Sequence, residues 1–173
     1  MNSGVESSGA EAASGGDELP PEYLFYLQYH LGRHREIELS KVLAGLELTI
    51  VKWRILSTLA RLGRSTMGEV ADFCVVDRTT LTRIIDQLVA VGYIERISDQ
   101  RDRRQTLLDL TQAGCDAYDT AVAAVFEFNL KAMDGIDPAD AAALERVLHR
   151  VIRNVIEDGQ WADSVLRFRK DGA

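Results

Sequence analysis

Arginine and threonine gather in one stretch of this acidic chain, between Arg78 and Arg104. Six arginines and four acidic residues give that stretch a net charge of +2, while the whole chain carries −7, so the remaining residues carry −9. Guanidinium groups can bond phosphate or guanine bidentately, and threonine can contact bases or thymine methyl groups. This distribution favours one localised anionic partner and argues against general adhesion of the whole surface to nucleic acid.

A helix is expected from Asp77, a suitable N-cap, to about Val91, where Gly92 follows as a terminator. Its core face, by the helical period, contains Leu81, Ile84, Ile85, Leu88 and Val89. The opposite side of the helix, which includes Asp86, is expected to be exposed. This side and the first turn supply the candidate DNA contacts, which are Arg78, Thr79, Thr80, Thr82 and Arg83. The free N–H groups of a helix N-terminus also favour phosphate. Taken alone, this face reads more simply as a solvated helix surface.

A β-hairpin is expected directly after this helix, because the apolar period changes from 3.6 to about 2. Its strands cover residues 93–97 and 106–110, and its polar tip contains Arg101, Asp102, Arg103 and Arg104. Arginines on such a tip can enter a narrow minor groove, and a neighbouring carboxylate can orient a guanidinium group. A solvated turn of mixed charge is the alternative interpretation of the tip by itself.

A short helix is also expected before Asp77. Thr66 and Glu69 have the spacing of a capping box, which predicts a helix from about Met67. Two short helices separated by a few residues form a helix-turn-helix candidate. A helix-turn-helix followed at once by an arginine-tipped hairpin indicates a winged helix, and this combination is more specific than either part.

Three segments carry a resemblance to a known family: LTIVKWRILSTL, DRTTLTRIIDQLVAVGYIERI and DQRDRRQTLLDLTQAG. They are similar to the MarR (multiple antibiotic resistance) regulators, in which Asp-x-Arg in the wing is followed by Leu-Thr-x-x-Gly. The resemblance spans residues 24–156. It implies a homodimeric DNA-binding repressor that a small molecule releases. It also implies that Arg104 is the wing-tip arginine, oriented by Asp102, and that the contacts of the recognition helix are Arg78, Thr79, Thr82 and Arg83.

The expected fold is therefore mainly α with a small β-hairpin wing, a winged helix-turn-helix joined to a helical dimerisation module. Long apolar stripes on the flanking helices agree with dimerisation. In chain order, we expect a disordered tail (1–19), the first part of the dimerisation module (20–45), the winged helix-turn-helix (46–110), the rest of the module (111–158) and a C-terminal tail (159–173). The sequence does not show where this C-terminal tail packs.

The resemblance also implies an effector pocket between the dimerisation helices and the DNA-binding lobe. Candidate lining residues are Tyr23, Tyr26, His30, Arg33 and Trp53. Aromatic walls with a few polar or cationic groups suit an aromatic carboxylate or its thioester. An equally simple interpretation is that these side chains only pack a dimer interface.

Other function classes receive less support from the sequence. A redox-sensing regulator would need a reactive thiol. Cys74 lies in an apolar FCVV run, where cysteine usually only packs, whereas Cys115 is expected in the first turn of a helix, where a thiolate could be stabilised. A winged helix that serves only as a protein-interaction module would not need the arginine-tipped wing. His30 and His34 have i, i+4 spacing but no further His or Cys near them, and no enzyme motif is present. We expect no cofactor, no metal site, no membrane span and a cytoplasmic protein.

Overall fold

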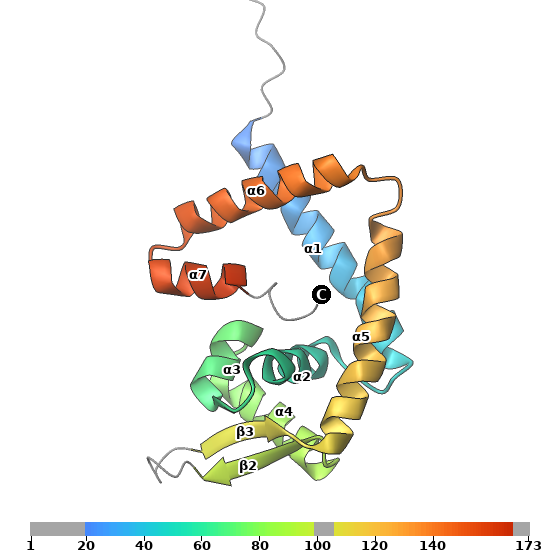
Figure 1. Ribbon diagram of the computed structural model, residues 1–173, viewed down its shortest axis with the longest axis vertical. Coiled ribbons are helices and arrows are strands. Elements are labelled where there is room, and N and C mark those ends of the chain that lie inside the picture. Colours follow the sequence, from blue (N-terminus) through green and yellow to red (C-terminus); the bar gives the residue numbers. More distant parts are fainter. Residues whose placement is uncertain (1–19, 99–105, 168–173) are drawn as a thin grey trace, which may run out of the picture. The chain divides into compact units, whose positions relative to one another are not determined.

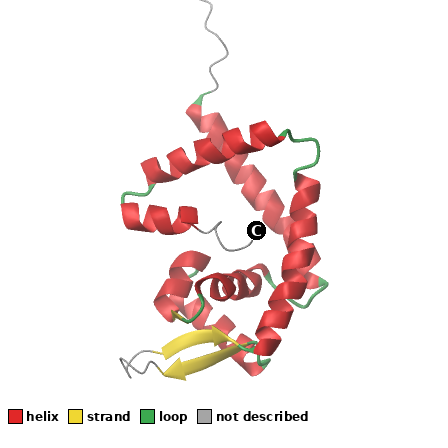
Figure 2. Ribbon diagram, viewed as in Figure 1, coloured by secondary structure: helices red, strands yellow, loops and turns green. Residues whose placement is uncertain are grey.

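The computed structural model describes residues 20–98 and 106–167, which form seven α-helices and a three-stranded sheet (Figures 1 and 2). The chain divides into two units, residues 1–35 and 36–173, and α1 (Pro21–Ala44) contributes to both. The predicted fold class, mainly α with a small β-hairpin wing, is confirmed. No helix in the described residues is both long and apolar enough to cross a bilayer. The tails at residues 1–19 and 168–173 lie outside the described residues.

Side-chain caps determine where five of the helices begin. The capping residues are Thr49, Thr66, Asp77, Thr111 and Asp137 for α2 (Ile50–Leu62), α3 (Met67–Cys74), α4 (Arg78–Ala90), α5 (Gln112–Ala132) and α6 (Pro138–Val155). Each accepts a hydrogen bond from a backbone N–H group that the helix itself cannot satisfy. The capping box between Thr66 and Glu69 is present, as predicted.

The sheet consists of β1 (Ser65–Thr66), β2 (Ile94–Ser98) and β3 (Thr106–Leu110), in the order β1-β3-β2 with antiparallel pairing. The two predicted strands are confirmed, although β2 begins one residue later than expected. The two residues of β1 show no apolar alternation, so the sequence did not predict this strand. Because β1 pairs with β3, the strand that returns from the wing is central in the sheet.

The core of the winged helix lies under α4. Leu81, Ile85 and Leu88 of α4 are completely buried, as the helical period predicted. They belong to the same core as Ile55 and Leu56 of α2, together with Val70 of α3, Leu108 of β3 and Leu43 of α1. Burial of each large aliphatic side chain stabilises the fold by about 1.5–3 kcal/mol. This core fixes which side of α4 remains exposed.

The Leu-Thr-x-x-Gly motif ties the start of α5 to the end of α4. The Thr111 hydroxyl donates to the Gly92 carbonyl oxygen at 2.5 Å and accepts from the Gly114 N–H group at 3.0 Å. The Thr111 N–H group donates to the carbonyl oxygen of Tyr93 at 3.1 Å. A Cβ atom on Gly114 would overlap that same oxygen and lie 2.9 Å from its carbonyl carbon. Glycine is required because the backbones approach so closely.

The apolar faces of α5 and α6 are largely exposed in this chain. The apolar spacing of the α5 segment predicts that Val125, Phe126 and Met133 share a buried side. Val125 is buried, but Phe126 is 59 % and Met133 46 % exposed, so the prediction is wrong for these two residues in the single chain. The apolar stripe of α6 has no buried residue. Helical periodicity identifies an apolar face, but it does not show whether the same chain covers it. The segment after Ile156 adds a further helix, α7 (Gly159–Arg167), in which Ala162 is buried.

Candidate nucleic-acid interface

The exposed side of α4 carries the predicted contact residues. Arg78, Thr79, Thr82 and Arg83 are exposed, and Thr80 is half-buried. Ile84 and Ile85, directly after Arg83, are buried on the other side of the same helix. The helix therefore presents a row of hydroxyl and guanidinium groups on a surface that packing in the core holds in place.

The N-terminus of α4 already holds an anion, the Asp77 carboxylate. Asp77 Oδ1 accepts a hydrogen bond from the Thr80 N–H group at 2.9 Å. Hydrogen bonds from the backbone and the hydroxyl group of Thr80 lower the pKa of Asp77 below its usual value, so the cap is charged at neutral pH. A phosphate at this helix end would meet that negative charge. The side chains of Arg78 and Thr79 are therefore better placed for phosphate contacts than the helix terminus.

The hydroxyl group of Thr82 is partly committed to its own helix. Thr82 Oγ1 donates to the carbonyl oxygen of Arg78 at 2.8 Å. The hydroxyl proton is used in that bond, while the oxygen lone pairs and the methyl group remain available. Thr82 can thus accept a hydrogen bond from a base amino group or contact a thymine methyl group.

The predicted contacts of the wing tip, Arg101, Asp102, Arg103 and Arg104, lie outside the described residues. The stems of the wing, β2 and β3, are described as far as Ser98 and from Thr106. They pair with each other from Ile94↔Leu110 to Ser98↔Thr106. All five residues of β2 are therefore paired with β3, and this ladder starts next to the C-terminal end of α4.

Two ion pairs that the sequence did not predict brace this ladder. Arg96 Nη2 of β2 lies 2.7 Å from Asp86 Oδ1 on α4, which links the wing to the recognition helix. Arg64 Nε lies 2.7 Å from Asp109 Oδ2 on β3. Arg64 and Asp109 are 45 residues apart in sequence, so no local pattern could reveal this pair. The pKa of Arg64 is raised by its hydrogen bond to Asp109 and by the charge of that carboxylate.

The five predicted effector residues lie in different units. Tyr23, Tyr26, His30 and Arg33 belong to the first unit, and Trp53 belongs to the second. Tyr26 and His30 have ring centroids 4.4 Å apart, and His30 and His34 stack at 5.9 Å along α1. Trp53 stacks on Tyr118 of α5 with centroids 5.5 Å apart and rings within 7° of parallel.

The two cysteines have different surroundings in this structure. Cys74 is buried, its Sγ atom lies 3.6 Å from Thr58 Oγ1, and burial raises the pKa of its thiol. A raised pKa lowers the fraction of reactive thiolate. Cys115 is partly exposed in the first turn of α5. Within residues 20–98 and 106–167, no group of three or more His, Cys, Asp and Glu side chains is arranged to hold a metal ion.

Comparisons with known proteins agree with this architecture. Residues 45–105 match the MarR family. The chain is 31 % identical over 88 residues to the multiple antibiotic resistance protein MarR of Salmonella typhimurium, a match that covers 51 % of this chain and 61 % of that protein. It is 23 % identical over 124 residues to the HTH-type transcriptional repressor IacR of Pseudomonas putida, covering 72 % and 74 % of the two chains.

A solved structure of a cysteine-to-serine mutant of E. coli MarR in complex with operator DNA has a similar fold. Its TM-score is 0.67 at 25 % identity, over 75 % of this chain and 93 % of that one. The likeness covers more of the chain than the family match, which spans residues 45–105.

Proposed function

Because this chain is a MarR-family winged-helix transcriptional regulator, we propose that it binds a pseudo-palindromic operator as a homodimer. The observation that carries this proposal is the exposed row of Arg78, Thr79, Thr82 and Arg83 on a helix whose other side is buried. That helix leads directly into the hairpin of β2 and β3. DNA is the partner that this arrangement of donors fits best.

We assign the contacts by chemistry. Arg83 and Thr82, further along the exposed face of α4, read base edges in the major groove. Arg78 and Thr79 in the first turn bind phosphate and fix the register. Arg101, Arg103 and Arg104 enter the neighbouring minor groove, with Asp102 orienting Arg104. The acidic remainder of the chain limits binding through other surfaces, since like charge repels the DNA backbone.

The homodimer is supported by the apolar faces that the chain leaves exposed. Phe126 and Leu130 on α5 and Leu144, Val147 and Val155 on α6 are large apolar side chains with 51–66 % exposure. A second copy of the chain would bury them, as interfaces between like subunits are mainly apolar. Two α4 helices related by a two-fold axis would meet half-sites about 10 bp apart, one helical turn of DNA.

We propose repression that an aromatic carboxylate, or its thioester, relieves. The IacR relative is a transcriptional repressor by name. The aromatic and cationic side chains predicted for an effector, Tyr23, Tyr26, His30, Arg33 and Trp53, would favour such an acid. The ligand would act by preferring a dimer geometry whose recognition helices no longer match successive major grooves. Since its target is DNA, we expect the protein to act in the cytoplasm.

Footprinting of the DNA upstream of the protein's own gene and neighbouring genes, at near-physiological salt, tests the central proposal. A protected pseudo-palindrome below the concentration that retards all DNA would support a site-specific dimer. Protection that appears only together with general retardation would favour a winged helix that binds another protein, and it would contradict operator binding.

Two substitutions separate the proposed contact types. Arg83→Ala should weaken binding to the operator about tenfold or more, and affect random DNA much less, because a base contact contributes about 1–3 kcal/mol of discrimination. Arg104→Ala should weaken both and flatten the dependence of affinity on salt. Lys41→Ala, which removes an exposed cation paired with Glu38 on α1, is the control and should change neither. Equal losses on both DNAs for Arg83→Ala would remove its base-reading role.

A further inference from the structure

The turn between α3 and α4 contains a residue in an unfavourable backbone conformation. Val75, the C-cap of α3, has a φ angle of 52° and a ψ angle of 51°, which is the left-handed helical region. A β-branched residue rarely adopts this region, where glycine or asparagine is usual. Val75 is also 87 % exposed, so burial of its own side chain does not offset the cost. The conformation must therefore be held by neighbouring residues.

The residues next to Val75 in the chain fix one part of this turn. Cys74 is buried, and Val76 packs against the core of the winged helix. The Val76 N–H group donates to the Ala71 carbonyl oxygen at 3.3 Å, and Asp77 caps the start of α4. Because α4 begins only three residues after Val75, the backbone angles at Val75 set the direction in which the recognition helix leaves the turn.

Helix α7 contacts the same end of α3. The ring of Trp161 meets the ring of Phe73 edge-on with centroids 5.0 Å apart, and Phe73 lies two residues before Val75. Ala162, next to Trp161, is buried, so α7 is closely packed at this point. Aromatic pairs in this arrangement contribute more than the area they bury. Trp161 therefore restrains the end of α3 from which the unfavourable turn starts.

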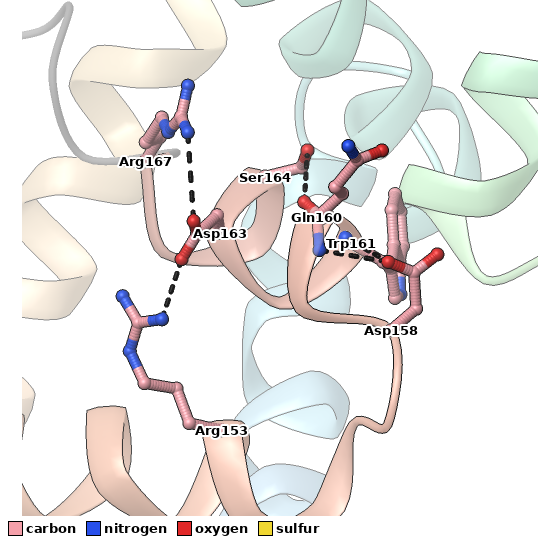
Figure 3. Close-up of polar contacts among 7 residues, drawn as sticks. All are labelled: Arg153, Asp158, Gln160, Trp161, Asp163, Ser164 and Arg167. Carbon is pink, nitrogen blue, oxygen red and sulfur yellow. Dashed lines mark hydrogen bonds and ion pairs between the residues drawn. The ribbon is translucent and has the colours of Figure 1, made fainter.

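Polar contacts hold α7 against α6 and fix the position of Trp161 (Figure 3). The Asp158 carboxylate accepts hydrogen bonds from the N–H groups of Gln160 and Trp161, at 2.9 and 3.1 Å, and so caps α7. Arg153 Nη1 of α6 lies 2.7 Å from Asp163 Oδ1 of α7. The helix that carries Trp161 is therefore fixed at its start and near its middle.

We propose that Trp161 is a positioning residue for the recognition helix. Its ring holds Phe73, and through Phe73 it keeps the turn at Val75 in the conformation that directs α4. Trp161 need not touch DNA, because it acts through the turn. The effect on DNA rests on the proposed DNA-binding function, whereas the restraint on the turn does not.

Hydrogen exchange of the full chain without DNA tests the restraint. The Val76 N–H group exchanges when its bond to Ala71 opens, so its exchange rate reports opening of the turn. Trp161→Ala should raise this rate about two- to tenfold, which is the contribution of one aromatic pair expressed as a ratio. Trp161→Phe keeps an aromatic ring and should restore most of the protection. Gln160→Ala, which changes an exposed neighbour on α7, is the control and should leave the rate unchanged.

Val75→Asn tests whether the unfavourable backbone makes the restraint necessary. Asparagine tolerates the left-handed region, so the turn should keep its shape with less support. In this background, Trp161→Ala should raise the exchange rate of Val76 less than it does in the native chain. An equal increase in both backgrounds would show that Trp161 does not act through Val75.

DNA affinity tests the effect on the recognition helix. Trp161→Ala should weaken operator binding about two- to tenfold and random DNA much less, because base contacts need α4 in one direction, whereas phosphate contacts carry no sequence information. Trp161→Phe should restore the affinity. A chain that was only partly unfolded would instead bind both DNAs less well by the same factor.

Four results would overturn the proposal. They are an unchanged exchange rate of Val76 in Trp161→Ala, equal increases in the native and Val75→Asn backgrounds, an unchanged operator affinity, and equal losses on operator and random DNA. If the exchange rates change as expected but footprinting finds no operator, the restraint on the turn stands and the proposed DNA-binding function fails.

Discussion

The winged-helix lobe and helix α6 use apolar residues in opposite ways. In the lobe, Leu81, Ile85 and Leu88 of α4 are completely covered by other parts of the same chain. In α6, the stripe that includes Leu144, Val147 and Val155 is exposed. Both helices are amphipathic, so their sequences alone do not distinguish them. The difference indicates that the lobe is stabilised within one chain, whereas α6 is completed by a second surface, which we propose is another copy.

Gly114→Ala should have the largest effect, because it forces a methyl group against backbone atoms of the lobe. The new methyl group would overlap the Tyr93 carbonyl oxygen, and backbone atoms cannot move away as a flexible side chain can. We expect a loss of about 3 kcal/mol or more in the free energy of unfolding, at the upper end of overpacking effects. Denaturant unfolding measures the change.

Gly32→Ala is the matched control, since nothing lies within 4 Å of a Cβ atom at this position in the middle of α1. This variant should be stabilised by about 0.5–1 kcal/mol, the usual preference of a helix interior for alanine. If Gly114→Ala were as stable as the native chain, the junction between α4 and α5 would not be close-packed.

The double substitution Leu144→Glu and Val147→Glu tests whether the exposed stripe of α6 forms the dimer interface. It places charge on the exposed stripe of α6, where a partner would bury it at a cost of several kcal/mol. We expect the mass by light scattering to fall from that of a dimer to 19.2 kDa. Far-UV circular dichroism should change little, because the stripe has no buried residue in the single chain.

Arg146→Glu introduces the same charge on the opposite side of α6 and should leave the mass of a dimer unchanged. A dimer that survives the double substitution would show that this stripe does not form the interface. The proposal of an α6-mediated homodimer would then be wrong, although the winged-helix fold would stand.

Asp77→Ser removes the negative charge at the N-cap of α4 but keeps a side chain that can cap the helix. Serine caps a helix about as well as aspartate, so the melting temperature at pH 7 should change little. Because the pKa of Asp77 is lowered in the folded protein, its contribution to stability is present above the unfolded pKa and is lost as the pH falls through the folded pKa. The serine variant should therefore lose less stability than the native chain at acidic pH.

The same variant should bind DNA a few-fold more tightly, since one negative charge next to the phosphates is removed. Affinity measured at two salt concentrations checks this, with a larger gain expected at low salt. Unchanged affinity at both would place Asp77 away from the DNA backbone.

The pair of Arg96 and Asp86 should give the smallest effect on stability. Both side chains are well exposed, and such pairs contribute about 0.2–1 kcal/mol. A double-mutant cycle with Arg96→Gln and Asp86→Asn measures the coupling. A value above about 2 kcal/mol would mean that the wing and the recognition helix depend on each other more than this exposed geometry allows.

Features fixed by neighbouring residues could be predicted from the sequence. The capping box of Thr66 and Glu69 and the caps at Asp77, Thr111 and Asp137 depend on bonds between residues two or three positions apart. The buried side of α4 follows equally from local spacing. These features are sufficient to define the helix-turn-helix and its exposed face.

Features that depend on distant residues could not be predicted. The Arg64–Asp109 pair and the packing of Trp161 on Phe73 join segments far apart in sequence. The exposure of Phe126 and Met133 could not be predicted either, because it depends on which other parts of the molecule cover the helix. The contacts of the wing tip and of the α1 aromatic residues stay predictions.

The bond between Thr111 and Gly92 has a mechanical consequence. It joins the C-terminal end of the recognition helix to the N-terminal end of α5, a helix of 21 residues. At 1.5 Å per residue, α5 is a lever about 31 Å long, so a tilt of about 5° displaces its far end by about 3 Å. Movement among the distal helices would therefore reach the face of α4 that we propose reads DNA as a rigid rotation, without any rearrangement inside the lobe.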